Sequence, residues 1–190
     1  MSKKLRQHIE KIVELTDEEF EYVLSHFSYR KYLKNHYVIQ NGDYVKYDYF
    51  VLNGLLKSWH IDDKGKAHII LFAMENWWIS DPKAFHNQTT ATLNVDCLED
   101  SETLYISLEN REKLCAEMRK VEYFFRKKTT AGYVASQKRI LSLISFNAKE
   151  RYQYLMQQYP DLTQRVPKSL IASYLGITRE TLSRLTSQSL

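Results

Sequence analysis

The stretch ASYLGITRETLSRL, residues 172–185, sets one glycine between two short segments whose apolar residues have helical spacing. Gly176 stands where the chain would need a left-handed turn, and the hydroxyl of Thr178 is placed to cap the helix that follows. A small residue, Ala172, lies where the two helices would approach each other. The spacing predicts a helix-turn-helix from Lys168 to Leu185.

The second of these helices divides its side chains between two faces. At about 100° per residue, the packing face is formed by Thr181, Leu182 and Leu185, and the free face by Arg179, Glu180, Ser183 and Arg184. Arginine can bind O6 and N7 of guanine together, and glutamate can accept a hydrogen bond from the cytosine amine. The free face therefore predicts contact with double-stranded DNA. The alternative is that Glu180 and Arg184 form only a surface ion pair.

Charge is distributed unevenly along the chain. Residues 1–110 carry 12 Lys and Arg against 17 Asp and Glu, whereas residues 111–190 carry 15 against 6. The basic C-terminal part is the part expected to meet a polyanion, and the acidic N-terminal part is expected to have another task. The charge alone is also compatible with a solvated basic surface.

The sequence lacks the features of exported and membrane-spanning chains. No apolar run approaches the roughly 18 residues that would span a bilayer, and the N-terminus has neither the apolar stretch nor the cleavage site of a signal peptide. We therefore expect a cytoplasmic protein with no membrane partner. Cys97 and Cys115 are too few for a disulfide framework or a four-cysteine metal site, and the histidines include no His-x-His pair, so no metal or other cofactor is expected.

Secondary-structure signals change along the chain. Thr16 and Glu19 have the spacing of a capping box, which predicts the start of a helix. From about Ser28 to Ser107, short segments rich in Tyr, Val, Ile, Phe and Trp alternate with turn signals such as QNGD and DDKG. This pattern is typical of an antiparallel sandwich or barrel of about eight strands. From about Leu108 onward the signals are helical.

A long helix is predicted over residues 115–146, with a second helix before Pro160 and a third that starts at Pro167. Small residues midway along the long helix would let another backbone approach, so the helix could join two copies of the chain. The residues predicted for this dimer face are Val121, Phe125, Gly132, Ala135 and Ile140. The alternative is a helix that packs only on its own sheet, because glycine costs roughly 1 kcal/mol in a helix and the heptad pattern is irregular.

The chain resembles the Crp/Fnr family of bacterial transcription regulators over nearly its whole length. The most specific part is GITRETLSRL, which is similar to the family's recognition helix with its Arg-Glu pair and a second arginine four residues after the glutamate. The resemblance implies an α+β fold: a helix and an antiparallel jelly roll of the cyclic-nucleotide-binding type over residues 1–114, a dimerisation helix over 115–146, and a helix-turn-helix domain over 147–190. Because the sequence stops at Leu190, the family's β-hairpin wing is not expected in full.

The same resemblance implies roles for individual residues. Arg179, Glu180 and Arg184 would read bases, with Ser183 on the same face, and the phosphate contacts would come from Thr178, Ser169 and Lys168. The protein would be a homodimeric, sequence-specific regulator rather than an enzyme, with RNA polymerase as a further partner. An effector in the jelly roll would bias the pair of long helices between two arrangements.

The sequence departs from the family where cyclic AMP would bind. Members that bind it hold the phosphate with a Gly-Glu turn and an Arg-Ser pair, whereas Ile79-Ser80 and Ala91-Thr92 stand at the corresponding positions here. A buried phosphate needs a paired cation, so cyclic AMP is expected to bind poorly or not at all. The predicted effector pocket consists of Trp77, Trp78, Ser80, Asp81, Lys83 and Thr92. The two tryptophans either fill part of the ligand space or pack in an ordinary core.

Other functions stay open at this point. The chain could be a regulator that needs no effector, or a protein-interaction module that keeps an unused helix-turn-helix. Haem bound through His60, His68 or Cys97 is a further possibility for the sensor. The alternative from another class is a cupin-like enzyme with a metal site in the jelly roll.

Overall fold

The computed structural model describes residues 2–187, which divide into two compact units. The first unit contains the chain up to His60 together with Leu71–Thr130, and the second contains Ile61–Ile70 and the chain from Ala131 onward. In the described part of the chain, no helix is both long enough and apolar enough to cross a membrane. Most of the β-structure lies in the first unit and the helix-turn-helix lies in the second.

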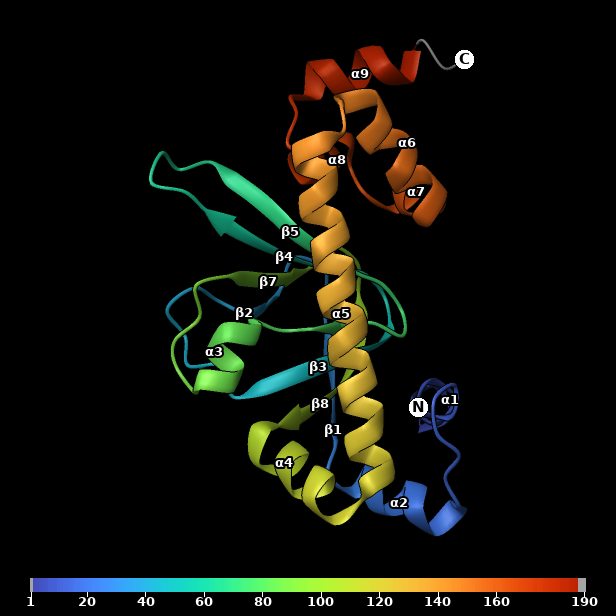
Figure 1. The fold of residues 1–190 in the computed structure, drawn as a ribbon. Helices are drawn as coiled ribbons and strands as arrows, with labels where there is room; N and C mark the ends of the chain where they lie inside the picture. Colours follow the sequence, from blue (N-terminus) through green and yellow to red (C-terminus); the bar gives the residue numbers. More distant parts are fainter. Residues whose placement is uncertain (1, 188–190) are drawn as a thin grey trace. The chain divides into compact units, whose positions relative to one another are not determined.

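Within residues 2–187, eight strands form two four-stranded sheets (Figure 1). One sheet has the order β1 (Ser28–Tyr32), β8 (Ser101–Ser107), β3 (Tyr47–Asn53) and β6 (Trp78–Ile79). The other has the order β2 (Tyr37–Ile39), β7 (Asn94–Cys97), β4 (Leu56–Ile61) and β5 (Ala67–Ala73). The registered strand pairs are antiparallel. The predicted antiparallel sandwich is therefore confirmed.

The space between the sheets is filled by apolar and tyrosine side chains. The rings of Tyr47 and Tyr105 have centroids 4.7 Å apart, and the centroids of Tyr49 and Tyr105 are 5.9 Å apart. The short helix α3 (Pro82–Asn87) adds the buried side chain of Phe85 to this core. The interior of the sandwich thus contains a cluster of phenol rings.

Gly54 connects β3 to β4 in a turn that no other residue fits well. Its φ is +95°, and a Cβ placed there would lie 2.3 Å from the Oγ of Ser101 and 2.7 Å from the carbonyl oxygen of Asp100. Both the left-handed backbone and the close approach require glycine. The turn Leu52-Asn53-Gly54 therefore lies where the chain passes from one sheet to the other.

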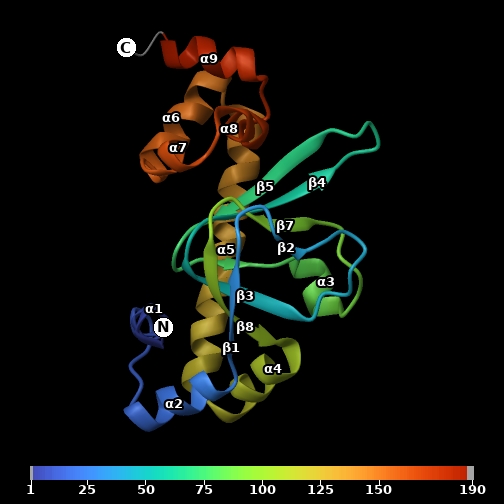
Figure 2. The ribbon, with the colours of Figure 1, turned by 180° about the vertical axis from the view of Figure 1, so that it is seen from behind.

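Helices cover the outer face of the sheet that contains β3 and β8. They are α1 (Ser2–Glu10), α2 (Asp17–Ser25), α4 (Leu108–Glu117) and the first part of α5 (Arg119–Ser145), as Figure 2 shows. Phe50 and Leu104 point from the sheet into this second core, where Leu5, Phe20 and Phe124 meet them from the helices. The helix α1 was not predicted from the sequence.

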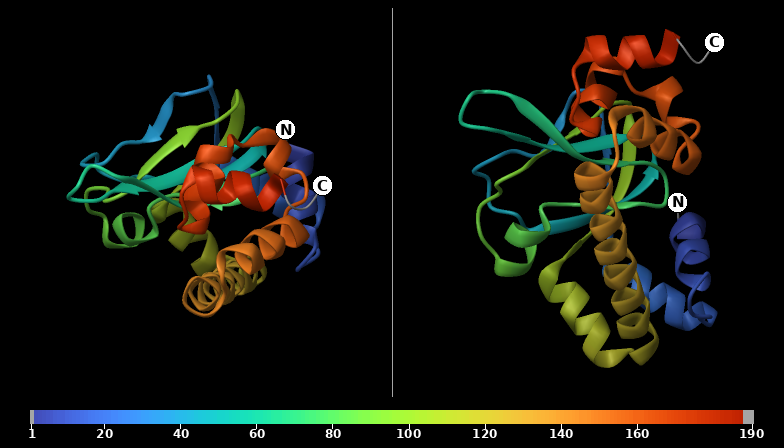
Figure 3. Two further views of the ribbon diagram at one scale, coloured as in Figure 1. Left: turned by 90° about the horizontal axis from the view of Figure 1, so that it is seen from above. Right: turned by 45° about the horizontal axis from the view of Figure 1, so that its top comes forward.

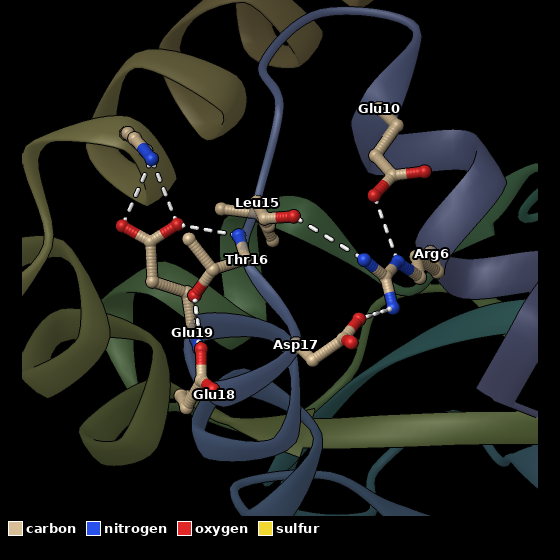
Figure 4. Close-up of polar contacts among 8 residues, drawn as sticks. Arg6, Glu10, Leu15, Thr16, Asp17, Glu18 and Glu19 are labelled. Atoms are coloured by element: carbon tan, nitrogen blue, oxygen red, sulfur yellow. Dashed lines mark hydrogen bonds and ion pairs between the residues drawn. The ribbon is translucent and has the colours of Figure 1, made fainter.

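The start of α2 confirms the predicted capping box (Figure 4). The Oγ1 of Thr16 accepts a hydrogen bond from the backbone N–H of Glu19 at 3.2 Å, and the Glu19 carboxylate accepts one from the N–H of Thr16 at 2.8 Å. The same carboxylate lies 2.7 Å from the Nζ of Lys120 on α5. On the other side, Arg6 of α1 donates to Asp17 at 2.5 Å. These contacts tie α1, α2 and α5 together.

The long helix is shorter than predicted. Instead of one helix over 115–146, α4 ends at Glu117 and α5 runs from Arg119 to Ser145. Met118 separates them because its backbone is extended, with φ −127° and ψ 99°. The break lets α4 and α5 pack on the same sheet in different directions.

The C-terminal helices of the second unit are α6 (Ala148–Gln158), α7 (Leu162–Arg165), α8 (Lys168–Leu175) and α9 (Arg179–Ser187), drawn in orange to red in Figure 3. A second capping box joins Asn147 and Glu150 at the start of α6. The segment 61–70 belongs to this unit, because the Oγ of Ser173 accepts from the N–H of Ile69 at 3.2 Å and donates to the carbonyl of Ala67 at 2.9 Å.

Candidate nucleic-acid interface

The turn between α8 and α9 has the predicted geometry. Gly176 ends α8 in the left-handed conformation, with φ 66° and ψ 35°. The N–H of Ile177 then donates to the carbonyl of Ala172 at 3.0 Å. Ala172 is 2% exposed, and Ile171 and Leu175 are also buried. Gly176 therefore has the predicted left-handed turn conformation, and Ala172 is buried where the sequence predicts close packing.

Thr178 caps α9 through its hydroxyl, as predicted. Its Oγ1 accepts a hydrogen bond from the N–H of Thr181 at 3.2 Å, which satisfies one of the free amides at the start of the helix. Leu182 is 1% exposed and anchors α9 to the rest of the unit. The cap and this anchor fix the start and the rotation of α9.

The opposite side of α9 is free. Its exposed residues include the four predicted for the DNA-reading face: Arg179, Glu180, Ser183 and Arg184. The pKa of Glu180 is lowered, because its carboxylate accepts hydrogen bonds from its own backbone N–H and from the hydroxyl of Thr178. Glu180 is thus an ionised acceptor at neutral pH. Two guanidinium groups and one carboxylate lie along one exposed helix surface.

The residues predicted to contact phosphates are divided between the two ends of α9. Thr178 lies at its start, whereas the Nζ of Lys168 donates to the Oγ1 of Thr186 in its last turn, at 3.3 Å. Ser169 is exposed next to Lys168 at the start of α8. The polar groups therefore flank the exposed face of α9 rather than gather at one point.

In the predicted effector pocket, the polar groups bond to the protein itself. The Asp81 carboxylate is buried and caps α3 by accepting from the N–H of Ala84 at 3.1 Å. It also accepts from the N–H of Thr92 at 2.8 Å, from the Thr92 hydroxyl at 3.0 Å and from the N–H of Leu93 at 3.1 Å. Although burial raises the pKa of Asp81, these hydrogen bonds outweigh it and lower the pKa below its usual value. The Asp81 carboxylate therefore carries a negative charge at this turn.

The other pocket candidates lie in different environments. Trp77 packs against the core between the sheets. Trp78 packs on the helix-covered side, where its ring centroid lies 5.3 Å from that of Phe50 and 5.6 Å from that of Phe125. The placement of Trp78 in the pocket is therefore wrong. Ser80 donates to the carbonyl of Tyr47 at 2.9 Å.

Two further candidates are exposed. Lys83 lies on the outside of α3, and the Thr92 residue that bonds to Asp81 is also largely exposed. The structure brings Ser80, Asp81 and Thr92 together and leaves Lys83 toward solvent.

The predicted dimer face needs a correction. Val121 and Phe125 are 2% and 6% exposed, because both pack in the core between α5 and the sheet of their own unit. They have no surface to offer to a second copy.

Farther along α5, Gly132 and Ala135 are exposed, as is Ile140 at 56%. The residues missing from the predicted set are Tyr133 and Ile144, which are 71% and 76% exposed. With Ile140 they form one stripe, since positions 133, 140 and 144 have the spacing of one helix face.

Comparisons with known proteins agree with this architecture. Residues 29–118 match the family model of the cyclic nucleotide-binding domain. The regulatory protein HlyX of Actinobacillus pleuropneumoniae is 24% identical over 163 residues, which are 80% of this chain and 67% of HlyX.

Two solved structures share the fold. FixK2 from Bradyrhizobium japonicum has a TM-score of 0.74 at 20% identity, with 85% of this chain and 83% of FixK2 covered. The regulator CLP of Xanthomonas campestris, described as responsive to c-di-GMP, has a TM-score of 0.71 at 16% identity, with 91% of each chain covered.

A cyclic-nucleotide-binding sandwich, a long helix and a helix-turn-helix in one chain define a class of two-part regulators. Over residues 29–118 the chain matches a cyclic nucleotide-binding domain, its sequence is similar to that of the regulatory protein HlyX, and its fold is that of FixK2, so it resembles the Crp/Fnr type of regulator. The predicted α+β fold is confirmed, these likenesses agree with the predicted family, and the matching family model is that of a cyclic nucleotide-binding domain.

Proposed function

We propose that this protein is a homodimeric transcription regulator that reads a specific DNA sequence with α9. The observation that carries the proposal is the exposed face of Arg179, Glu180 and Arg184, which directly follows the Gly176 turn. Arginine pairs with guanine in the major groove and glutamate accepts from cytosine, so this face supplies groups of both kinds. Residues near the start of a recognition helix are the ones that reach base edges.

The exposed stripe on α5 supports assembly of two copies. Tyr133, Ile140 and Ile144 are each more than half exposed on one side of a helix. Large apolar side chains this exposed along one side of a helix mark a candidate interaction site. Because an identical stripe on a second copy is complementary in chemistry, we propose that two α5 helices pair along it and present two copies of α9 to DNA.

The function is tested by selecting binding sequences from random duplex DNA. We expect the selected pool to contain two similar half-sites whose centres lie about one helical turn apart, since a two-fold dimer presents two recognition helices. Sequencing of the bound fraction reads this directly. A pool without a common motif would contradict sequence-specific binding, and a single half-site would contradict the dimer.

We also predict that cyclic AMP does not bind the sandwich. The Asp81 carboxylate takes the hydrogen bonds of Ala84, Thr92 and Leu93 and would repel a phosphate brought to the same turn. Isothermal titration with cyclic AMP up to about 1 mM should give no saturable heat, which means a binding free energy weaker than about −4 kcal/mol. Saturable binding at micromolar concentrations would show that this turn opens for an anion.

A further inference from the structure

We propose that a groove in the second unit binds a small aromatic carboxylate. The groove lies between the C-terminal part of α5, α6 and α8, three elements labelled in Figure 1, and has a volume of about 360 Å³. Sites for small molecules commonly measure about 300–1,000 Å³. The residues that decide its chemistry are three cations and three tyrosines: Lys138, Arg139, Arg151, Tyr154, Tyr159 and Tyr174.

The positive charges of the groove are not compensated by carboxylates. Among the described residues that line it, none is Asp or Glu. Arg139 donates to the backbone carbonyls of Ile69 and Tyr174, each at 3.0 Å, and Arg151 donates to the carbonyl of Phe146 at 3.0 Å. Carbonyl groups satisfy donors but carry no net charge, so the groove is electropositive.

Two observations indicate that Arg139 and Arg151 lack an anionic partner in the part of the chain that the structure describes. Burial lowers the pKa of Arg139, which is the effect of desolvating a cation that has no carboxylate beside it. The Nε of Arg151 is buried and has no hydrogen-bond partner within the described residues. A buried donor without a partner is costly, so the Arg151 guanidinium keeps unused hydrogen-bonding capacity beside the groove.

The tyrosines add flat surfaces that suit a ring. The guanidinium of Arg139 lies 3.5 Å from the centroid of the Tyr174 ring, so one wall already holds a stacked planar pair. Leu155 and Leu175, both 3% exposed, add an apolar floor. A planar apolar ring with one carboxylate matches this combination of cations, ring faces and apolar surface.

The groove faces away from the stripe that we assign to the second copy. Ala131, Ala135 and Lys138 line the groove, whereas Ile140 and Ile144 lie on the other side of α5 at about 100° per residue. Pairing of two α5 helices would therefore leave the groove open. The site does not depend on DNA binding, so its test is separate from that of the regulator function.

The test uses 4-(trifluoromethyl)benzoate, followed by fluorine NMR on the full chain without DNA. We expect saturable line broadening with a dissociation constant between about 10 μM and 1 mM, and at least tenfold weaker binding of the neutral 4-(trifluoromethyl)benzamide. Equal binding of acid and amide, or no saturable effect of the acid, would overturn the proposal.

Two charge-reversed variants locate the site. Lys138→Glu places a carboxylate in the groove, whereas Lys149→Glu makes the same charge change at an exposed position of α6 outside it. We expect Lys138→Glu to weaken binding of the benzoate by about tenfold or more and Lys149→Glu to change it less than about twofold. Equal losses in the two variants would mean binding to the general surface charge and would also overturn the proposal. Circular dichroism of both variants checks that each is folded.

Discussion

Replacing Arg179 by alanine is expected to weaken binding to the selected DNA site by about 30-fold or more. A bidentate arginine–guanine pair discriminates by about 1–3 kcal/mol, and a two-fold dimer loses two of them. The expected loss of about 2–6 kcal/mol corresponds to a factor between about 30 and more than 10⁴. Fluorescence anisotropy with a labelled duplex, at one stated salt concentration, measures it.

A charge-matched control separates base reading from electrostatics. Arg119→Ala removes the same charge from an exposed position of α5, so we expect affinity to fall less than about threefold. Selection repeated with Arg179→Ala should show relaxed preference at one position in each half-site, whereas Lys168→Ala should weaken all sequences alike. An unchanged motif with Arg179→Ala would remove Arg179 from the reading face.

The helix-turn-helix could be predicted from the sequence because its determinants are local. The left-handed Gly176, the small Ala172 and the cap at Thr178 act on neighbours within a few residues, and each has the predicted geometry. The capping box of Thr16 and Glu19 was predictable for the same reason. Turn and cap chemistry depends on little else than the adjacent chain.

The face that we propose for the dimer could not be assigned from the sequence because α5 has apolar residues on two sides. Periodicity shows that Val121, Phe125 and Ile140 lie on a helix, but only the packing shows that the first two are covered by their own sheet. Apolar residues on two sides of a helix give a mixed periodicity that does not identify one buried face. The choice between faces depends on tertiary contacts.

The error at Trp78 has a different origin. Trp78 is the first residue of β6 and Trp77 directly precedes it, and neighbouring residues of an extended chain point to opposite faces. One of them was therefore excluded from the sandwich interior by the strand period alone. Because β6 has only two residues, the sequence shows no alternation from which the direction of each side chain could be predicted. The helix α1 was not predicted because Leu5 and Ile9 are the only apolar residues in its sequence, and the third buried side chain is the polar His8.

The largest expected effect on assembly comes from the double variant Ile140→Glu, Ile144→Glu. The unmodified protein should have about twice the 22.6 kDa mass of one chain in solution by light scattering, and the variant should have the mass of one chain. The change would bring four carboxylates into the interface of each dimer, where burying unpaired charges costs several kcal/mol. Since the free helix surface tolerates glutamate, the variant should stay folded. Its affinity for a two-half-site duplex should fall sharply, because only one recognition helix remains per particle.

Val121→Ala distinguishes this assignment from the one suggested by the sequence alone. Because Val121 is buried in the core of its own unit, its truncation should lower the free energy of unfolding by about 1–3 kcal/mol and leave the mass in solution unchanged. Urea unfolding and light scattering on the same sample measure both quantities. If Val121→Ala separated the subunits while Ile140→Glu, Ile144→Glu did not, the two copies would meet along the side of α5 that we assign to its own sheet. Dimer formation that survives the double variant would remove the exposed stripe as the interface and with it the basis for the spacing of the two half-sites.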